Sequence, residues 1–329
     1  MFDIKVGVIG AGSMGRNHVR VLSELGKLVG VCDISEKASW EIGKKFGCPS
    51  YTDMDEFLKE TGVEAVSIAT PTTHHAEAAI KCLGSGVDVL VEKPIASTLE
   101  DGKRILEAAD QSGRTLAVGM TERHNPVVKF TRELIEKGEL GGIVTIMSRR
   151  VSNYPSRISD VGVITDLGVH DIDVLRYLTD SEVSSVYALG GRVKGGKYED
   201  HATIMLSFEN GVEGVLEVSW LTPMKLRKIT ITGVEGVAEM DYIDQEVMVS
   251  TSTSFDKDKF DLWRIPQIYD MRRIRVRNEE PLVRELSDFL EAVRDGKEPL
   301  VSGQDGLKTL QIAKAAEESI ATGKKVELQ

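Results

Sequence analysis

Apolar and polar residues follow one another along the first 120 residues in blocks of two kinds. Segments with a helical apolar period, such as 76–83 and 105–109, predict helices that cover a sheet. Short runs of Val, Ile, Leu and Ala without polar alternation predict buried strands at residues 4–9, 28–32, 65–69, 88–91 and 116–118, with a short strand near 49–52. Strands that alternate with helices in this way indicate a parallel, doubly wound sheet.

The pattern changes after about residue 120. Asn125 and Pro126 are typical of a helix start, and Gly138 is typical of its end. Alternating runs at 202–208 and 212–220 flank an Asn-Gly pair, which predicts a hairpin. Further alternation follows at 228–243, and helical patterns at 282–293 and 307–321 close the chain.

These patterns predict two α/β domains. Residues 1–120 are expected to form a dinucleotide-binding Rossmann domain, and residues 121–329 a substrate-binding domain with a large, open antiparallel sheet. The uncovered face of such a sheet predicts a second copy of the chain, so we expect a homodimer or homotetramer.

Composition and charge exclude several classes of function. The net charge is −11, from 41 Lys and Arg against 52 Asp and Glu, which disfavours nucleic acid as a partner. No apolar run approaches the roughly 18 residues of a membrane span, and the N-terminal segment enters the first strand without an export signal. Three cysteines are too few for a disulfide framework. We therefore expect a cytoplasmic protein.

The first chemical motif is Gly10-Ala11-Gly12-Ser13-Met14-Gly15, which lies between the first predicted strand and a helix. In this context Gly10 allows a tight turn, Gly12 lets a pyrophosphate approach the backbone, and Gly15 lets the helix approach the strand. Asp33, at the end of the second strand, is placed to bind the ribose hydroxyls and to repel a 2′-phosphate, which predicts NAD rather than NADP. The alternative is a glycine-rich turn in which Asp33 only caps the next helix.

Two further groups of residues carry candidate chemistry. Lys93, in Glu92-Lys93-Pro94, directly follows a predicted strand at the edge where ligands of parallel sheets bind. Asp166, His170 and Asp173 lie on a predicted helical stretch, where a histidine beside carboxylates can act as a base near neutral pH. The alternatives are a surface Glu-Lys pair and a buried structural histidine.

In combination, these motifs resemble the glucose-fructose oxidoreductase, inositol 2-dehydrogenase and rhizopine-catabolism (Gfo/Idh/MocA) family over essentially the whole chain. The resemblance implies an NAD-dependent dehydrogenase in which Lys93 binds the reacting hydroxyl, His170 is the acid/base and Asp166 contacts the substrate or the histidine. It also implies a cofactor site made of Gly10, Gly12, Ser13, Met14, Gly15, Asp33, Thr70, Pro71, His75, Glu92 and Lys93. Thr72 stands where the family often has Asn. No metal is expected, and His74 with His75 is interpreted as a helix-terminal residue and a cofactor contact.

The segment Glu122-Arg123-His124-Asn125-Pro126 is similar to the Glu-Arg-Phe-Asn-Pro segment of UDP-N-acetylglucosamine 3-dehydrogenases within this family. It suggests a nucleotide sugar oxidised at its 3-hydroxyl, with a diphosphate bound by arginines. The expected substrate-binding residues are Arg123, Asn125, Arg157 and Asp173, with Arg149 and Arg150 as further arginines. Two alternatives stay open at this point: an inositol, polyol or free-sugar dehydrogenase, and a non-catalytic NAD-binding sensor.

Overall fold

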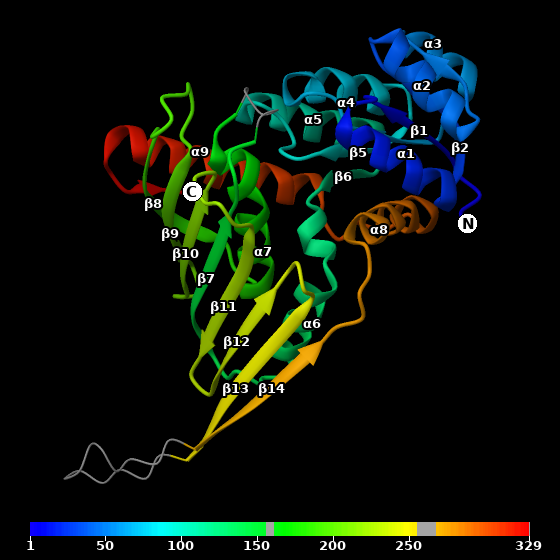
Figure 1. Ribbon diagram of the computed structural model, residues 1–329. Coiled ribbons are helices and arrows are strands. Elements are labelled where there is room, and N and C mark those ends of the chain that lie inside the picture. The colour runs from blue at the N-terminus through cyan, green and yellow to red at the C-terminus, as the bar shows by residue number, and fades with distance from the viewer. Residues whose placement is uncertain (156–160, 255–267, 329) are drawn as a thin grey trace, which may run out of the picture. The chain divides into compact units, whose positions relative to one another are not determined.

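A computed structural model describes residues 1–155, 161–254 and 268–328 (Figure 1). The chain divides into two compact units, each built from two separate segments. The first unit contains Met1–His124 and Glu280–Gln311, and the second contains Asn125–Glu279 and Ile312–Gln329. Residues 280–311 thus belong with the N-terminal residues, so neither unit is one continuous stretch of chain, as domains of 1–120 and 121–329 would be.

The first unit has a six-stranded parallel sheet with the order β3-β2-β1-β4-β5-β6. This is the order of a dinucleotide-binding Rossmann fold, and it confirms the predicted fold class. The strands are β1 (Lys5–Ile9), β2 (Lys27–Cys32), β3 (Ser50–Tyr51), β4 (Ala65–Ile68), β5 (Asp88–Glu92) and β6 (Leu116–Gly119). The helices are α1 (Ser13–Leu25), α2 (Glu36–Phe46), α3 (Met54–Thr61), α4 (His75–Gly84), α5 (Leu99–Ser112) and α8 (Pro281–Asp295).

Local sequence explains where several of these helices begin. The side chains of Ser35, Asp53 and Thr98 accept hydrogen bonds from backbone N–H groups in the first turns of α2, α3 and α5. Each of these helices also has an acidic residue in its first turn, which the helix dipole stabilises.

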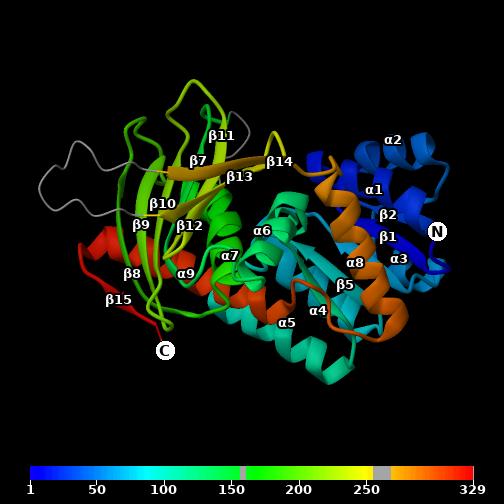
Figure 2. The same ribbon diagram turned by 90° about the horizontal axis from the view of Figure 1, so that it is seen from below.

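The core of the first unit includes residues far apart in sequence. Val6 and Val8 of β1 and Leu22 of α1 belong to the same buried cluster as Leu286 and Phe289 of α8. Helix α8 packs against α1, and the two views show it alongside that helix (Figure 2). This apolar contact explains why residues 280–311 join the first unit.

The second unit has a nine-stranded sheet with the order β14-β13-β12-β11-β7-β10-β9-β8-β15. Its strands are β7 (Ile143–Val151), β8 (Val183–Gly191), β9 (His201–Phe208), β10 (Glu213–Ser219), β11 (Leu226–Gly233), β12 (Gly236–Asp241), β13 (Glu246–Ser254), β14 (Ile268–Arg275) and β15 (Val326–Glu327). Its helices are α6 (Pro126–Glu136), α7 (Val169–Thr179) and the second half of α9 (Gly303–Thr322).

Along β9 the buried and exposed residues alternate, so one face of the sheet is covered and the other is open. Helix α6 packs against β12 and β13, and α7 packs against β7 and β10. The predicted hairpin is present, because β9 and β10 pair in antiparallel register around Asn210 and Gly211.

The sheet is mixed rather than wholly antiparallel. Strands β7 and β10 pair in parallel, because the chain leaves β7 through α7 and returns by the β8–β9–β10 meander. None of the helices within the described residues is long and apolar enough to cross a membrane.

Candidate active site

The glycine-rich loop joins β1 to α1 and has the geometry of a dinucleotide loop. Gly10 has a φ of +101°, and a Cβ there would lie 2.6 Å from the carbonyl carbon and oxygen of Ala69 at the end of β4. A Cβ on Gly15 would collide with the Gly10 carbonyl group. At Gly12, in contrast, a Cβ would meet no atom of the described residues within 4 Å, so the loop is open where a ligand would approach.

Helix α1 begins differently from its neighbours. Its N-cap is Gly12, no side chain within the described structure caps it, and its first turn has no acidic residue. Ser13 is exposed and Met14 is half-buried in this turn. An uncapped helix N-terminus without carboxylates favours an anion such as a pyrophosphate. Binding of a pyrophosphate by Ser13 and Met14 stays a prediction.

Asp33 lies just after β2 and faces the same loop. One carboxylate oxygen accepts a hydrogen bond from the backbone N–H of Ala11 at 2.6 Å, and the other accepts one from Ser35 at 2.8 Å. The N-cap of α2 is Ser35 and not Asp33. The carboxylate is therefore held beside the glycine-rich loop, where the ribose of a dinucleotide binds in this fold.

A second loop follows β4. The Thr70 hydroxyl oxygen is buried and has no hydrogen-bond partner among the described residues. A buried hydroxyl in this condition is costly unless a ligand supplies the partner. Together with Gly12 and Asp33, it fits a dinucleotide that binds along the carboxyl ends of the strands.

His75 connects this loop to the one after β5. Its Nδ1 lies 2.9 Å from the Pro94 carbonyl oxygen and its Nε2 lies 2.9 Å from the Thr70 carbonyl oxygen. Burial lowers the pKa of this imidazole, although the carbonyl contacts partly oppose the effect. The ring holds two candidate cofactor loops together, and its direct contact with a cofactor stays a prediction.

Lys93 directly follows β5 and is half-buried. Its backbone N–H donates a hydrogen bond to Oε2 of Glu92 at 3.1 Å, and Oε1 of Glu92 lies 2.9 Å from Nε2 of His18. Burial alone would raise the pKa of Glu92, but His18 and Lys93 lower it overall. Glu92 is therefore ionised, and it fixes the backbone of the candidate catalytic lysine through its hydrogen bond with the Lys93 N–H.

In the second unit, Asp166 and His170 lie at the start of α7. Asp166 belongs to a π-helical turn, Ile164–Gly168, and His170 lies in the first turn of the following α-helix. The i, i+4 argument for an ideal α-helix therefore does not apply directly to this pair, because a π-turn is wider. Both residues are half-buried, whereas Asp173 is fully buried.

An ion pair beneath this helix was not anticipated from the sequence. Asp171 accepts hydrogen bonds from Arg150 at 2.8 Å and 3.1 Å, and both side chains are only 1% exposed. The guanidinium also lies over the Tyr242 ring. Arg150 is thus a structural residue of the second unit. Arg149, the other arginine considered for a diphosphate, pairs with Glu217 at 2.8 Å on the surface.

The predicted substrate-binding residues near residue 124 also form hydrogen bonds within the protein. Arg123 is 5% exposed and donates to the Leu300 carbonyl at 2.9 Å and to Asp305 at 3.1 Å. Asn125 caps α6 and donates to the Tyr242 carbonyl. These contacts do not support a diphosphate site on Arg123. Arg157 lies outside the described residues.

His124 is also buried. Burial lowers the pKa of its imidazole to about 3, and the nearby charges of Arg123 and Arg284 act in the same direction. The ring is therefore neutral in the folded protein at physiological pH.

The fold and the glycine-rich loop are those of a dinucleotide-binding protein with a second α/β unit. Residues 4–120 match the oxidoreductase family with an NAD-binding Rossmann fold, GFO_IDH_MocA, and residues 128–239 match the GFO/IDH/MocA C-terminal domain. The chain belongs to this family, and it is an NAD-dependent dehydrogenase.

Three relatives illustrate the range of this family. The chain is 30% identical to YrbE of Bacillus subtilis, an uncharacterized oxidoreductase, over 99% of the chain and 97% of the relative. It is 28% identical to myo-inositol 2-dehydrogenase of Thermotoga maritima, over 99% of both chains.

The third relative also has a solved structure. The chain is 27% identical to UDP-N-acetylglucosamine 3-dehydrogenase of Acidithiobacillus ferrooxidans over 95% of the chain and 96% of the relative. The structure of that enzyme, GnnA, superposes with a TM-score of 0.88 at 25% identity, covering 98% of this chain and 99% of the other.

Proposed function

We propose that this protein oxidises a secondary hydroxyl group of a sugar or nucleotide sugar. The observation that carries the proposal is the lysine at the carboxyl end of β5, whose backbone is fixed by the buried carboxylate of Glu92. A cationic lysine at this edge of a Rossmann sheet is suited to bind a substrate oxygen beside a nicotinamide.

The reaction converts a CH–OH group into C=O, with loss of a hydride and a proton. Bound NAD would supply the hydride acceptor. His170 takes the proton from the hydroxyl, and the ammonium of Lys93 stabilises the negative charge that develops on the oxygen. Asp166 supports His170 or contacts the substrate.

The chain's own residues also account for the choice of cofactor. Asp33 accepts hydrogen bonds with both oxygens and lies beside the loop, so a 2′-phosphate at this position would meet a carboxylate. The hydroxyl of Thr70 is the buried donor that a bound dinucleotide would satisfy.

Our leading substrate is UDP-N-acetylglucosamine, oxidised at its 3-hydroxyl. The similarity to the Acidithiobacillus enzyme over nearly the whole chain supports this choice. Arg123 does not supply the diphosphate contact in this proposal, because it is bonded to Asp305 and Leu300. The second candidate is an inositol, and the Thermotoga relative favours it to a comparable extent.

We further propose that two copies associate through the open face of the second sheet. Met147, Val215, Met205 and Tyr187 stand opposite one another on the neighbouring strands β7, β10, β9 and β8. Met147 and Met205 are each 53% exposed, which is unusual for apolar side chains at the centre of a sheet.

The substrate is tested by following NAD reduction by the purified protein with UDP-N-acetylglucosamine, myo-inositol and glucose. We expect the highest kcat/KM for the nucleotide sugar, with UDP as an inhibitor. Efficient oxidation of myo-inositol together with no effect of UDP would replace the first candidate by the second. Absence of NAD reduction with a broad range of sugars and polyols would contradict the proposed function.

A further inference from the structure

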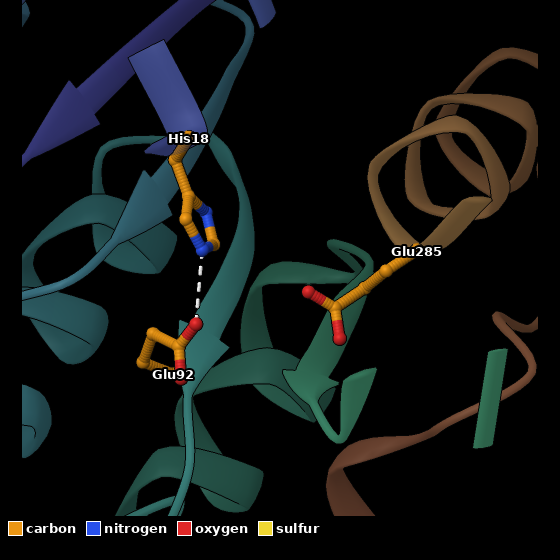
Figure 3. Close-up of side chains that lie close together, drawn as sticks. All are labelled: His18, Glu92 and Glu285. Carbon is orange, nitrogen blue, oxygen red and sulfur yellow. Dashed lines mark hydrogen bonds and ion pairs between the residues drawn. The ribbon is translucent and has the colours of Figure 1, made fainter. Parts of the chain in front are cut away.

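Three buried side chains meet beside the backbone of Lys93 in the first unit (Figure 3). They are His18 of α1, Glu92 at the end of β5, and Glu285 of α8. One nitrogen or oxygen atom from each lies within 4.8 Å of the others. Figure 3 shows the Glu285 carboxyl group pointing from its helix toward the other two side chains.

Hydrogen bonds satisfy two members of this cluster and not the third. His18 contacts the Ser67 hydroxyl through Nδ1 at 2.6 Å and Glu92 through Nε2 at 2.9 Å. The second oxygen of Glu92 accepts the Lys93 N–H. Glu285 is 1% exposed, and neither of its oxygens has a hydrogen-bond partner among the described residues.

The groups that face Glu285 are mainly acidic. Burial raises the pKa of Glu285 well above its ordinary value, and the charges of Glu92 from β5, Asp288 from its own helix and Glu122 from the turn Thr121–His124 act in the same direction. The Thr121 hydroxyl acts in the opposite direction and lowers the pKa of Glu285, but it does not outweigh burial and the charge of Glu92. From α1 the facing group is His18, which is already bonded to Glu92.

Two carboxylates this close cannot both stay charged in a buried site without compensation. Glu92 has a histidine and a backbone N–H to stabilise its charge, whereas Glu285 has neither. The protonated form of Glu285 is therefore favoured over the charged form. A divalent cation held by the same three side chains would be the other way to remove the excess charge.

We propose that Glu285 is a positioning residue that stays a neutral carboxylic acid facing Glu92. The cluster then carries one negative charge, on the carboxylate that fixes the Lys93 backbone. The consequence for catalysis rests on the role proposed above for Lys93. Loss of the Glu285 proton would place a second negative charge beside Glu92 and would disturb the support of the lysine.

Stability measured as a function of pH tests directly whether Glu285 carries a proton, and the measurement needs no substrate. A carboxyl group with a raised folded pKa does not lower the free energy of unfolding at a pH below its unfolded pKa. As pH rises from the unfolded pKa toward the folded pKa, the free energy of unfolding decreases, because the unfolded chain releases the proton first. Glu285→Gln keeps the shape and neutrality of the acid without this loss. We therefore expect its Tm to exceed that of the wild type by a margin that grows as pH rises above about 5.

Glu291→Gln is the matched control, because it makes the same substitution at an exposed position of the same helix. Its Tm difference from the wild type should not show this growth with pH. A Glu285→Gln protein that is less stable than the wild type across the whole range would overturn the proposal. Stoichiometric divalent metal in the wild type that is absent from Glu285→Gln would also overturn it.

Measurements of kcat distinguish a positioning role of Glu285 from a purely structural one. Glu285→Gln should keep wild-type kcat at neutral pH, and its alkaline decline should move to higher pH. Glu285→Leu should lose roughly tenfold in kcat with unchanged affinity for NAD, since a misplacement of about 1 Å can cost about a hundredfold. Equal pH profiles for the wild type and Glu285→Gln would contradict the positioning role. If no substrate is oxidised at all, the proposed function fails, while the Tm measurement still decides the protonation.

Discussion

Replacing either of two glycines in the same loop with alanine should have different effects on folding. Gly10→Ala puts a Cβ 2.6 Å from the Ala69 carbonyl atoms and 2.7 Å from the Thr70 nitrogen, at a φ of +101° that L-residues rarely adopt. These are backbone atoms, so the contact cannot be relieved by a side-chain rotation. Gly12→Ala puts its Cβ in open space at a φ of −69°.

The structure sets the size of the first effect. To reach ordinary contact at 3.4 Å, the loop and the end of β4 must separate by about 0.8 Å. Backbone strain and overpacking each cost about 1–3 kcal/mol, so Gly10→Ala should destabilise the first unit by about 3 kcal/mol. For a unit of this size, that corresponds to a decrease in Tm of roughly 10 °C.

The assay is thermal unfolding with and without NAD. The wild type should gain about 2.7 kcal/mol of stability at an NAD concentration of about a hundred times Kd. Gly12→Ala should keep the Tm of the free protein but lose most of this gain, because its methyl group occupies the space of the pyrophosphate. Gly10→Ala should have a lower Tm as the free protein and should also lose the stabilisation by NAD.

Gly84→Ala, at the end of α4, is the control, because its Cβ also meets nothing within 4 Å in the described structure. It should keep both the Tm and the response to NAD. The assignment of the loop is refuted if Gly12→Ala retains wild-type NAD affinity, or if Gly10→Ala has the Tm of the wild type.

Two further predictions concern single side chains. Asp33→Ser should narrow the preference for NAD over NADP in titrations, and equal wild-type affinity for the two cofactors would contradict the role of this carboxylate. His124 has a folded pKa of about 3, below its ordinary value, so the wild type should lose stability as pH falls from about 6.5 toward 3, because only the unfolded chain binds the proton. His124→Phe should reduce this loss by up to about 1.4 kcal/mol per pH unit, and an unchanged acid profile in denaturant titrations would count against a neutral buried ring.

The Rossmann sheet could be predicted from the sequence because its signals are local. Five apolar runs coincide with strands β1, β2, β4, β5 and β6, and the glycine motif lies between a strand and a helix as expected. Asp33 could be identified in the same way, since its distance from the motif is fixed by one helix and one strand.

The features that could not be predicted from the sequence depend mainly on contacts between distant segments of the chain. The position of α8 is set by Leu286 and Phe289 packing into the N-terminal core, and no local pattern at those residues names their partner. Glu285 is buried as a consequence, although it is an ionisable residue in an amphipathic helix. Arg123 was predicted to bind a ligand from the similarity of residues 122–126 to a segment of the family. Its partner Asp305 is 182 residues away in sequence, and no local pattern connects the two. The π-turn before α7 has no sequence signature that we could use.

We propose that Lys93 and His170 perform the chemistry of an NAD-dependent dehydrogenase. The most direct measurement is the rate of NAD reduction by wild-type, Lys93→Ala and His170→Ala proteins with the best substrate, together with the Kd for NAD of each. We expect both variants to bind NAD as the wild type does and to lose about a hundredfold or more in kcat. A His170→Ala protein with near-wild-type kcat would contradict the account.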